Sequence, residues 1–490
     1  MAGKTGGVTY ATREESYFAQ RGLTRYAGVW SVWALGVGAV ISGHFSGWNF
    51  GFGTGGWGGM LVAAGIIAIM YLGLTLSIAE MSAALPHTGA AYSFARTSMG
   101  PWGGFVTGLF ENIEYVMAPA VVVTFIGGYA GSIFGIPGEW QPALWVAIYV
   151  VFLALNIFGA ALSFRVTLVV TLLSLAVLVI FWVSAIPRID FARFALDISA
   201  GGGHLPGGSG PLFPFGFSGV LATLPFAVWL FLAIEQVPLA AEESVEPRRD
   251  MPRGILLAFG TLVLSALMIV LLNPSAGIGS FALATSGEPL LDGFRAIYGD
   301  TGAAILGGVA LTGLIASFHT ILFAQGRQIY SLSRAGYFPS LLSITHPRWK
   351  TPHLAMIAGS VLGLGVVLIV WTASGGPSSD WVGVSAIVLN MVVFGAMLSY
   401  IAQALSFILL RRNQSGIDRP FRSPLGIAGA AVTILIALVT LVYQLQDSAF
   451  SRVVPWVLAW LAIGIAYFAL VGRHRLILSP EEEFARAHGK

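Results

Sequence analysis

Long apolar segments alternate with short polar connections along almost the whole chain. A membrane-spanning helix needs roughly 20 apolar residues, and about twelve segments are long enough. Their expected extents are 28–55, 57–84, 102–134, 142–161, 165–186, 215–241, 253–273, 301–333, 353–372, 381–410, 424–443 and 453–472. The pattern therefore predicts an all-α membrane protein with about 12 transmembrane helices.

Composition narrows the class further. Of the 490 residues, 56% are hydrophobic and only 10% are charged, whereas soluble domains carry about 25% charged residues. This balance excludes soluble, collagen-like, disordered and nucleic-acid-binding proteins. The chain contains no cysteine, so disulfides, thiolate nucleophiles and cysteine-ligated metals are excluded as well. We expect no cofactor, no metal site and no nucleic-acid partner; the lipid bilayer is the expected surrounding.

Basic residues predict the orientation. Residues 1–27 are polar and lack the apolar core of a signal peptide, so we expect a cytoplasmic N-terminal tail. Threading the spans from this tail leaves few of the 25 Lys and Arg residues outside, namely Arg188, Arg193, Arg295 and Arg452. The positive-inside rule then predicts a multi-pass protein of the inner (plasma) membrane, with a second cytoplasmic tail at 473–490.

One long polar connection divides the chain. Residues 187–214 are rich in Gly and Pro and are expected to form an extracellular linker. The linker separates a first five-helix repeat at 28–186 from a second, inverted five-helix repeat at 215–410. Two additional helices follow at 424–472.

The first and sixth spans contain helix-breaking residues at comparable positions. Gly36, Gly38 and Gly43 lie in the first span, and Pro225 and Pro238 lie in the sixth. The run GVGAVISG lacks the strand and the following acidic residue of a dinucleotide-binding motif. Close packing of small residues explains most of these glycines. However, broken helices at corresponding positions of two halves indicate a transport site near the middle of the membrane.

Acidic residues within spans are the strongest chemical signal. Glu111 and Glu114 lie in the third span, in the stretch ENIEY, and Glu235 follows the presumed break of the sixth. A charge at the centre of a spanning helix costs roughly 2.5–3.5 kcal/mol, so such acids usually line a cavity or meet a cation. A protonated, purely structural Glu is the simpler alternative for either third-span acid. Since no Lys or Arg is expected deep enough to neutralise them, we favour a cationic substrate or a proton relay.

Several other side chains are candidates, each with a structural alternative. His44 and His319 can titrate near neutral pH, although a single buried His is more often only hydrogen-bonded. Trp229, Tyr115 and Phe318 can enclose an ammonium group, although most Trp residues lie at membrane interfaces. Further candidates are Asn390 for the pathway, Glu80 for an interfacial cap, and residues 242–254, whose dense charges suit a gate.

Three motifs resemble the amino acid, polyamine and organocation (APC) transporter superfamily. They are GVGAVISG in the first span, LAIEQVPLAAEESVEPRRDMPRG after the sixth, and GRQIYSLSRAGYFP after the eighth. The runs SGHFSGWNFG and AEMSAALPHTGAAYSFARTSMGPWGGF, together with ENIEY, are similar to the bacterial ethanolamine permease family. The resemblance implies a LeuT-like five-plus-five inverted repeat, with substrate held between the broken first and sixth helices.

The resemblance also implies site residues. A substrate carboxylate would meet amides that match Ile41, Ser42 and Gly43, and an ammonium would meet carbonyls near Trp229 and Leu232. Ethanolamine has no carboxylate, so its hydroxyl would need only neutral donors, which His44 and Ser42 could supply. Glu114 falls about where the family's third-span pocket residue lies, and Glu235 matches a sixth-span acid used in gating or proton linkage. The complete substrate-binding set is Ala39, Ile41, Ser42, Gly43, His44, Glu111, Glu114, Tyr115, Trp229, Leu232, Phe318, His319 and Asn390, with Glu235 and Glu111 for proton coupling or the gate.

These observations predict a secondary active transporter, not an enzyme. It would import a small cationic amine, with ethanolamine as the preferred substrate and a proton as the coupling ion, by alternating access. A general amino acid permease of the same superfamily is the first alternative. A membrane amine sensor that does not transport is the second.

Overall fold

The computed structural model describes residues 4–5, 7–11, 17, 20–200, 203–205, 207–376, 381–446 and 453–477. In this part of the chain, ten helices are long and apolar enough to cross a membrane. Two shorter apolar segments, Val29–Phe45 and Gly216–Val228, occupy the places of the first and sixth spans. The predicted all-α membrane fold is confirmed. Arg452 and the tail beyond residue 477 lie outside the described residues.

The first half of the chain forms α2 (Val29–Val40), α3 (Ser42–Phe45), η1 (Trp48–Gly51), α4 (Phe52–Ala84), α5 (Ala90–Phe134), η2 (Gly138–Trp140), α6 (Gln141–Ile157) and α7 (Ala160–Ala185). The connection that follows contains η3 (Ile186–Arg188), η4 (Phe191–Ala195), β3 (Ser199–Ala200) and β4 (Gly203–His204). Its strands pair as a small antiparallel hairpin.

The second half forms α8 (Gly216–Val228), η5 (Ile234–Glu243), α9 (Pro247–Leu272), α10 (Ser280–Leu283), α11 (Pro289–Arg334), η6 (Ser340–Ser343), α12 (His353–Ala373) and α13 (Trp381–Asn413). The last elements are α14 (Gly426–Gln446), α16 (Val454–Leu470), η8 (Gly472–His474) and β5 (Leu476–Ile477). The two helices beyond α13 match the expected additional pair.

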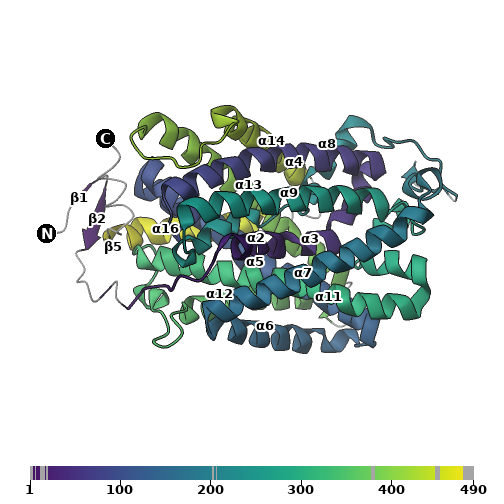
Figure 1. Ribbon diagram of the computed structural model, residues 1–490, viewed down its shortest axis with the longest axis horizontal. Coiled ribbons are helices and arrows are strands. Elements are labelled where there is room, and N and C mark those ends of the chain that lie inside the picture. Colours follow the sequence, from purple (N-terminus) through teal and green to yellow (C-terminus); the bar gives the residue numbers. More distant parts are fainter. Residues whose placement is uncertain are drawn as a thin grey trace.

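A small sheet marks one end of the helix bundle. Strand β2 (Val8–Ala11) pairs antiparallel with β1 (Lys4–Thr5) and parallel with β5, where Tyr10 opposes Leu476. The sheet lies at one end of the long axis, and the connection between α7 and α8 lies at the other (Figure 1). We call these the sheet end and the linker end. Both terminal segments therefore meet at the same end of the bundle, as an even number of spans requires.

The two halves repeat a distinctive feature. Helix α5 contains a kink at Gly100 (φ 77°, ψ −175°), and α11 contains one at Gly299 (φ 70°, ψ −177°). Both kinks lie about ten residues into a helix of about 45 residues, which is the third span of its half when the interrupted span is counted as the first. A positive φ with extended ψ is accessible mainly to glycine. The shared kink, together with the two interrupted spans, gives the five-plus-five arrangement.

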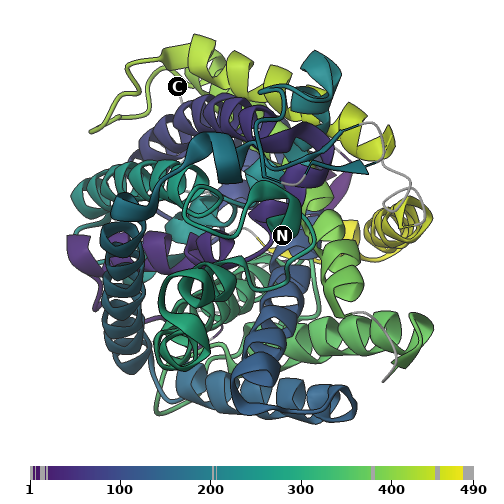
Figure 2. The same cartoon turned by 90° about the vertical axis from the view of Figure 1, so that its right-hand side faces the viewer.

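Helix α5 lies at the centre of the bundle and α16 at its periphery. Most of the apolar part of α5 is buried, whereas most of α16 is exposed. In the view from the linker end, α16 (yellow) and α6 (blue) lie at the outer edge (Figure 2). Because the surroundings of a spanning helix are hydrocarbon, exposed apolar side chains on α16 are the expected surface. The acidic third span is thus an interior element.

The first span is shorter than the sequence predicted. It ends at Phe45 instead of continuing to residue 55, because Ser46 is extended and Gly47 has φ 94°. The glycine-rich stretch that follows begins the second spanning segment at Trp48. Within the first span, α2 and α3 are separated at Ile41.

The sixth span is interrupted more strongly. Helix α8 ends at Val228, residues 229–233 form turns, and η5 begins at Ile234. Ala233 has φ 83°, which is unusual for a residue with a side chain. Such strain persists only where the surrounding packing enforces it, and it occurs often at functional sites.

Candidate functional site

The interruptions of the first and sixth spans face each other. A Cβ added to Gly43 would lie 2.1 Å from the carbonyl oxygen of Trp229, so the two backbones are in direct contact. A Cβ on Gly47 would lie 2.9 Å from the Trp229 indole and 3.0 Å from Leu389. Glycine is therefore required at both positions. The predicted approach of the two broken spans is present in the structure.

Trp229 closes the linker-end side of this contact. Its ring meets Phe125 of α5 edge to face, with centroids 6.2 Å apart. The side chain is buried, and its indole N–H has no hydrogen-bond partner among the described residues. An unpaired buried donor beside two helix breaks can bind a polar group of a ligand.

A serine hydroxyl holds the first span open. Ser42 would normally donate its N–H to Gly38 O four residues earlier, but it donates to Ser317 Oγ of α11 at 2.9 Å. The Ser317 hydroxyl in turn donates to Gly38 O at 2.8 Å. Since Ile41 N donates to Val37 O, the Ile41 and Ser42 amides both have partners in this conformation. Ala39 is buried in the same helix.

His44 joins three elements instead of pointing into the contact between the breaks. Its Nε2 donates to Leu230 O at 3.0 Å, because a carbonyl oxygen only accepts. Its Nδ1 then accepts from Ser265 Oγ of α9 at 2.8 Å. Both ring nitrogens are occupied, so His44 fixes the first span to the sixth and to α9.

Three carboxyl groups gather on the sheet-end side of the breaks. Glu111 and Glu114 of α5 and Glu235 of η5 are all completely or almost completely buried. Tyr115 donates to Glu111 Oε1 at 3.4 Å. Tyr400 of α13 lies 2.8 Å from Glu235 Oε2 and 3.5 Å from Glu114 Oε1. The structure thus brings together the acids that the sequence singled out on separate spans.

Sequence reasoning missed three members of the site. Tyr400 and Tyr71 are hydrogen-bonded to each other through their hydroxyls at 3.0 Å, and Ser317 fills the first-span break. Each is a single polar side chain in an apolar span, and such residues are frequent in membrane helices. A tyrosine close to the middle of a span, away from both interfaces, was the available signal for the first two.

Two other candidates, His319 and Phe318, lie away from the facing breaks. His319 is bonded to Asn156 and Ser163, between α6, α7 and α11. The ring of Phe318 packs against Tyr149 and Phe152 of α6. Both side chains contact residues of neighbouring helices and contribute to the packing of α11 against α6 and α7.

Asn390 is also separate from the acids. Its carbonyl accepts from Gln444 of α14 at 2.8 Å. It lines a cavity of about 240 Å³ together with Thr54, Pro225 and Tyr443. This cavity lies beside α8 instead of between the breaks. Leu232, by contrast, is buried within the sixth-span break itself.

Comparison with known proteins identifies the family. The model of the amino acid permease family matches this chain over residues 31–475. The chain belongs to the amino acid permease family. It is 32% identical to an uncharacterized transporter, R00093, of Rhizobium meliloti (strain 1021), over 68% of this chain and 70% of that protein. It is 25% identical to the branched-chain amino acid permease BcaP of Bacillus subtilis (strain 168), over 93% of this chain and 94% of that one.

Solved structures agree on the fold. A manganese transporter of Eremococcus coleocola superposes with a TM-score of 0.53 at 13% identity, covering 95% of this chain and 97% of that chain. At this identity the match establishes the fold alone. The protein is a multi-pass transporter of the APC superfamily, not an enzyme.

Ion pairs join several elements of the permease at the sheet end. Arg334 of α11 donates to Glu242 Oε2 at 2.9 Å, and His87 Nε2 lies 3.3 Å from Glu242 Oε1. Arg327 binds Glu243 through both Nε and Nη2, at 3.0 and 2.9 Å. These contacts join η5 to α11 and to the turn before α5. The charged stretch beginning at residue 242 therefore forms ion pairs with other elements, and its role as a gate stays a prediction.

Arg327 corrects one expectation. A basic residue does lie deep in a span, since Arg327 is completely buried in α11. However, its guanidinium forms a bidentate pair with Glu243, so it does not neutralise Glu111, Glu114 or Glu235. Within the described ranges, no ion pair joins those three acids to a basic side chain.

Backbone contacts add to these connections at the sheet end. The N–H groups of Tyr26 and Ala27, just before α2, donate to Glu243 O at 2.7 and 2.9 Å. Ala27 and Ser244 form an isolated parallel bridge. The sheet-end halves of the first and sixth spans are therefore attached to each other directly.

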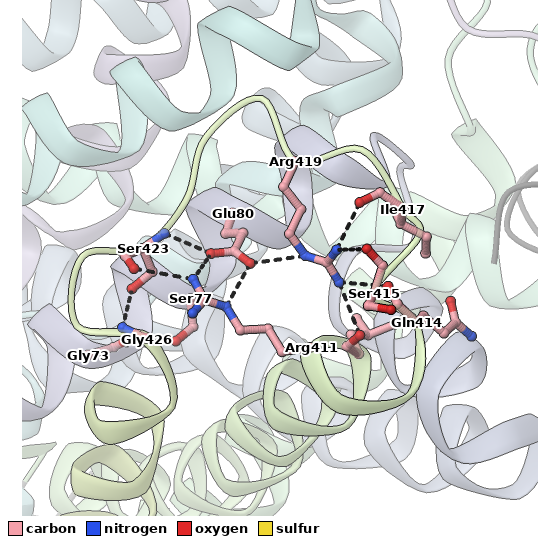
Figure 3. Close-up of polar contacts among 11 residues, drawn as sticks. Gly73, Ser77, Glu80, Arg411, Gln414, Ser415, Ile417, Arg419, Ser423 and Gly426 are labelled. Atoms are coloured by element: carbon pink, nitrogen blue, oxygen red, sulfur yellow. Dashed lines mark hydrogen bonds and ion pairs between the residues drawn. The ribbon is translucent and has the colours of Figure 1, made fainter. Parts of the chain in front are cut away.

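Glu80 is a buried clamp, not the interfacial cap that the sequence suggested. It accepts from Arg411 Nε of α13 at 2.9 Å and from Ser423 N at 2.7 Å, and Arg419 Nε lies 3.2 Å away (Figure 3). Arg419 also donates to the carbonyls of Ile417, Leu410 and Gln414 at the end of α13. The carboxylate thus joins α4 to α13 and to the loop before α14.

Proposed function

We propose that this permease imports a small cationic amine, ethanolamine, by proton-coupled alternating access. One observation supports the proposal above all: three buried carboxyl groups lie beside two facing helix breaks, and no basic side chain of the described part is paired with them. A buried negative charge needs a counter-charge. An ammonium group and a proton both supply one.

The proposed pocket lies between the breaks and the acids. Carbonyl groups of the interrupted sixth span near Trp229 and Leu232, with Glu114 and Tyr115, would receive the ammonium group. Ala39, Ile41, Ser42 and Gly43 would form the first-span wall. The Ile41 and Ser42 amides bond to other groups here, which suits a substrate without a carboxylate. Glu235 and Glu111 would serve proton coupling or the gate.

Cytoplasmic location of the sheet end is part of the same proposal. The predicted threading places most of the 25 Lys and Arg residues on the side of the termini. The ion pairs of Glu242 and Glu243 would then form an inner gate in the inner membrane. The division into repeats at 28–186 and 215–410, with an external linker at 187–214, follows from the same threading.

Uptake of labelled ethanolamine into proteoliposomes, with and without a pH gradient, tests this function. We expect uptake that increases when the outside is more acidic than the lumen. The Glu114→Gln protein should insert normally but take up at least about tenfold less amine, because a charged hydrogen bond contributes about 1.5–3 kcal/mol. Unchanged uptake by this variant would move the ammonium site elsewhere.

A general amino acid permease is the second candidate. It is favoured by the 25% identity with the branched-chain amino acid permease BcaP over nearly the whole chain. Competition decides between the two. Excess alanine or arginine should leave ethanolamine uptake intact if the amine is the substrate, whereas strong inhibition by alanine would favour a zwitterion.

A further inference from the structure

Four side chains from four elements form one hydrogen-bonded group. Glu114 comes from α5, Glu235 from η5, Tyr400 from α13 and Tyr71 from α4. Tyr400 Oη lies 2.8 Å from Glu235 Oε2, 3.0 Å from Tyr71 Oη and 3.5 Å from Glu114 Oε1. All four are completely or almost completely buried. We call these residues the Tyr400 group.

The number of protons in the group constrains its charge. A tyrosine hydroxyl has one proton to donate. The short contact assigns the Tyr400 proton to Glu235, and Tyr71 then donates to Tyr400. The Tyr400 oxygen that faces Glu114 therefore has no proton left for it. Glu114 makes a favourable contact there only if its own carboxyl group is protonated and donates.

The placement of the two acids leads to the same result. Glu114 Oε1 and Glu235 Oε2 lie against the same Tyr400 hydroxyl, at 3.5 and 2.8 Å. The other carboxyl oxygens, Glu114 Oε2 and Glu235 Oε1, have no hydrogen-bond partner in the described part of the chain. Two buried carboxylates that face one hydroxyl repel each other without a cation, so they share a proton.

Basic side chains of the described residues nearest in sequence to the site are paired with other acids. Arg327 and Arg334 of α11 bind Glu243 and Glu242. Glu111 and Tyr115, two further titratable groups of α5, bond to each other. In the described part of the chain, the ionisable groups that bond to the Tyr400 hydroxyl are two acids and a phenol.

We propose that Glu114, Glu235 and Tyr400 form one binding unit for the coupling proton, with Tyr71 as its positioning residue. This inference rests on the proposed function. The unit takes up one proton from water on one side of the membrane and releases it to water on the other, and only an O–H bond forms and breaks. Its second negative charge is left for the substrate ammonium: as the ammonium reaches Glu114, the shared proton moves to Glu235. The loaded unit is then neutral, which lowers the cost of occlusion in hydrocarbon.

Two assays on the same proteoliposomes test the unit. The first measures counterflow of labelled ethanolamine at equal pH on both sides, which needs substrate exchange but no net proton movement. The second measures accumulation driven by an imposed pH gradient, with a luminal pH dye to count protons per substrate. Tyr400→Phe should lower the driven accumulation at least about tenfold more than it lowers counterflow, and a tenfold difference corresponds to about 1.4 kcal/mol of coupling free energy.

Tyr149→Phe is the matched control. Tyr149 is a buried tyrosine of α6 whose hydroxyl has no hydrogen-bond partner among the described residues, so its removal should leave both assays unchanged. Tyr71→Phe keeps the Tyr400 hydroxyl but removes its donor. We expect it to retain coupling while shifting the pH at which driven uptake is half-maximal, a readout that a purely structural role would not change.

The outcomes separate the two proposals. Absence of ethanolamine counterflow in the unsubstituted protein would overturn the proposed function. Normal counterflow with a normal proton count in Tyr400→Phe would overturn the proton unit alone. If Tyr400→Phe does not fold, Tyr71→Phe decides, because an unchanged pH profile in that variant would also contradict the unit.

Discussion

Single atoms determine whether the first and sixth spans can be interrupted at the middle of the membrane. Backbone groups released from a helix must find new partners there, because hydrocarbon offers none. The Ser317 hydroxyl supplies one such partner by bonding both Gly38 O and Ser42 N. Gly43 supplies space, since its missing Cβ lets the carbonyl of Trp229 approach. The break is therefore maintained by the Ser317 hydroxyl and by the absence of a side chain at Gly43.

Replacing Ser317 with Ala should damage transport while preserving the fold. The change leaves a buried carbonyl and a buried amide without their bridge, at a cost of about 1–3 kcal/mol. Either the break closes into a regular helix or the open form is destabilised, so uptake should fall about tenfold. Thr312→Ala, on an exposed face of the same helix, is the control. Full uptake by Ser317→Ala would show that the bridge is dispensable.

Gly43→Ala should abolish transport. The new methyl group would overlap Trp229 O, and a carbonyl of the backbone cannot move as a flexible side chain can. Gly65→Ala in α4 is a matched control, because a Cβ there meets no atom within 4 Å. Counterflow by both purified variants is the measurement. Equal activities would mean that the two interrupted spans are farther apart than 2.1 Å implies.

At the scale of elements, polar contacts connect segments at the two ends of the bundle. Near the sheet end, Glu80 joins α4 to α13. At the linker end, a cap segment at 280–288 rests on the end of the first span. Asn49 donates to Leu283 O and Ser286 O at 2.6 and 2.7 Å, and Ser46 donates to Gly287 O at 2.6 Å. An alternating-access cycle has to release such contacts in turn.

The Glu80 clamp should contribute strongly to stability. Glu80→Gln leaves the partly buried Arg411 and Arg419 without their carboxylate, and a hydrogen bond to a charged group contributes about 1.5–3 kcal/mol. Thermal unfolding of the purified protein should show a clear decrease in Tm. Arg248→Gln removes an exposed pair with Asp418 and should change little, since such pairs contribute about 0–1 kcal/mol. Similar Tm values for the two variants would contradict the clamp.

The cap segment should respond to pH through Glu288. Burial raises the pKa of Glu288 to about 7; the Ser132 hydroxyl and Arg295 oppose this shift, and Asp292 adds to it. A carboxyl group with a raised pKa stabilises the closed contact fully below its ordinary pKa, and this stabilisation is lost as the pH rises through 7. The cap should therefore open on the alkaline side.

Hydrogen exchange of the cap segment measures this effect. We expect faster amide exchange in residues 280–288 at about pH 8.5 than at about pH 6, after correction for the intrinsic rate. Glu288→Gln should exchange at the slow rate at both pH values, because its amide stays neutral. A pH response that survives in this variant would exclude Glu288 as its origin.

At the scale of the whole molecule, strands β1, β2 and β5 lie at the opposite end of the bundle from the connection between α7 and α8 (Figure 1). This separation makes the proposed orientation testable, and the chain contains no native cysteine to interfere. Ser415→Cys at the sheet end should react with a membrane-impermeant maleimide only after cells are opened. Thr285→Cys at the linker end should react in intact cells. The reverse pattern would invert the proposed topology.

The sequence by itself determined the class, the spans and the acids. Apolar length follows directly from bilayer thickness, which is why the segment expected at 353–372 agrees with α12 at His353–Ala373. Glu111, Glu114 and Glu235 stood out because charge is costly in hydrocarbon wherever the helix is packed. The resemblance to the APC superfamily then predicted that the broken first and sixth spans face each other.

Only the tertiary structure decided which polar side chains meet. His44 and His319 looked available in the sequence, but each is bonded to neighbours on other helices. Tyr400, 165 residues from Glu235, looked like an ordinary aromatic residue until packing placed its hydroxyl against the acid. Hydropathy depends on each residue's own transfer energy, whereas a hydrogen bond depends on the relative placement of two helices, and the local pattern of neither helix contains that placement.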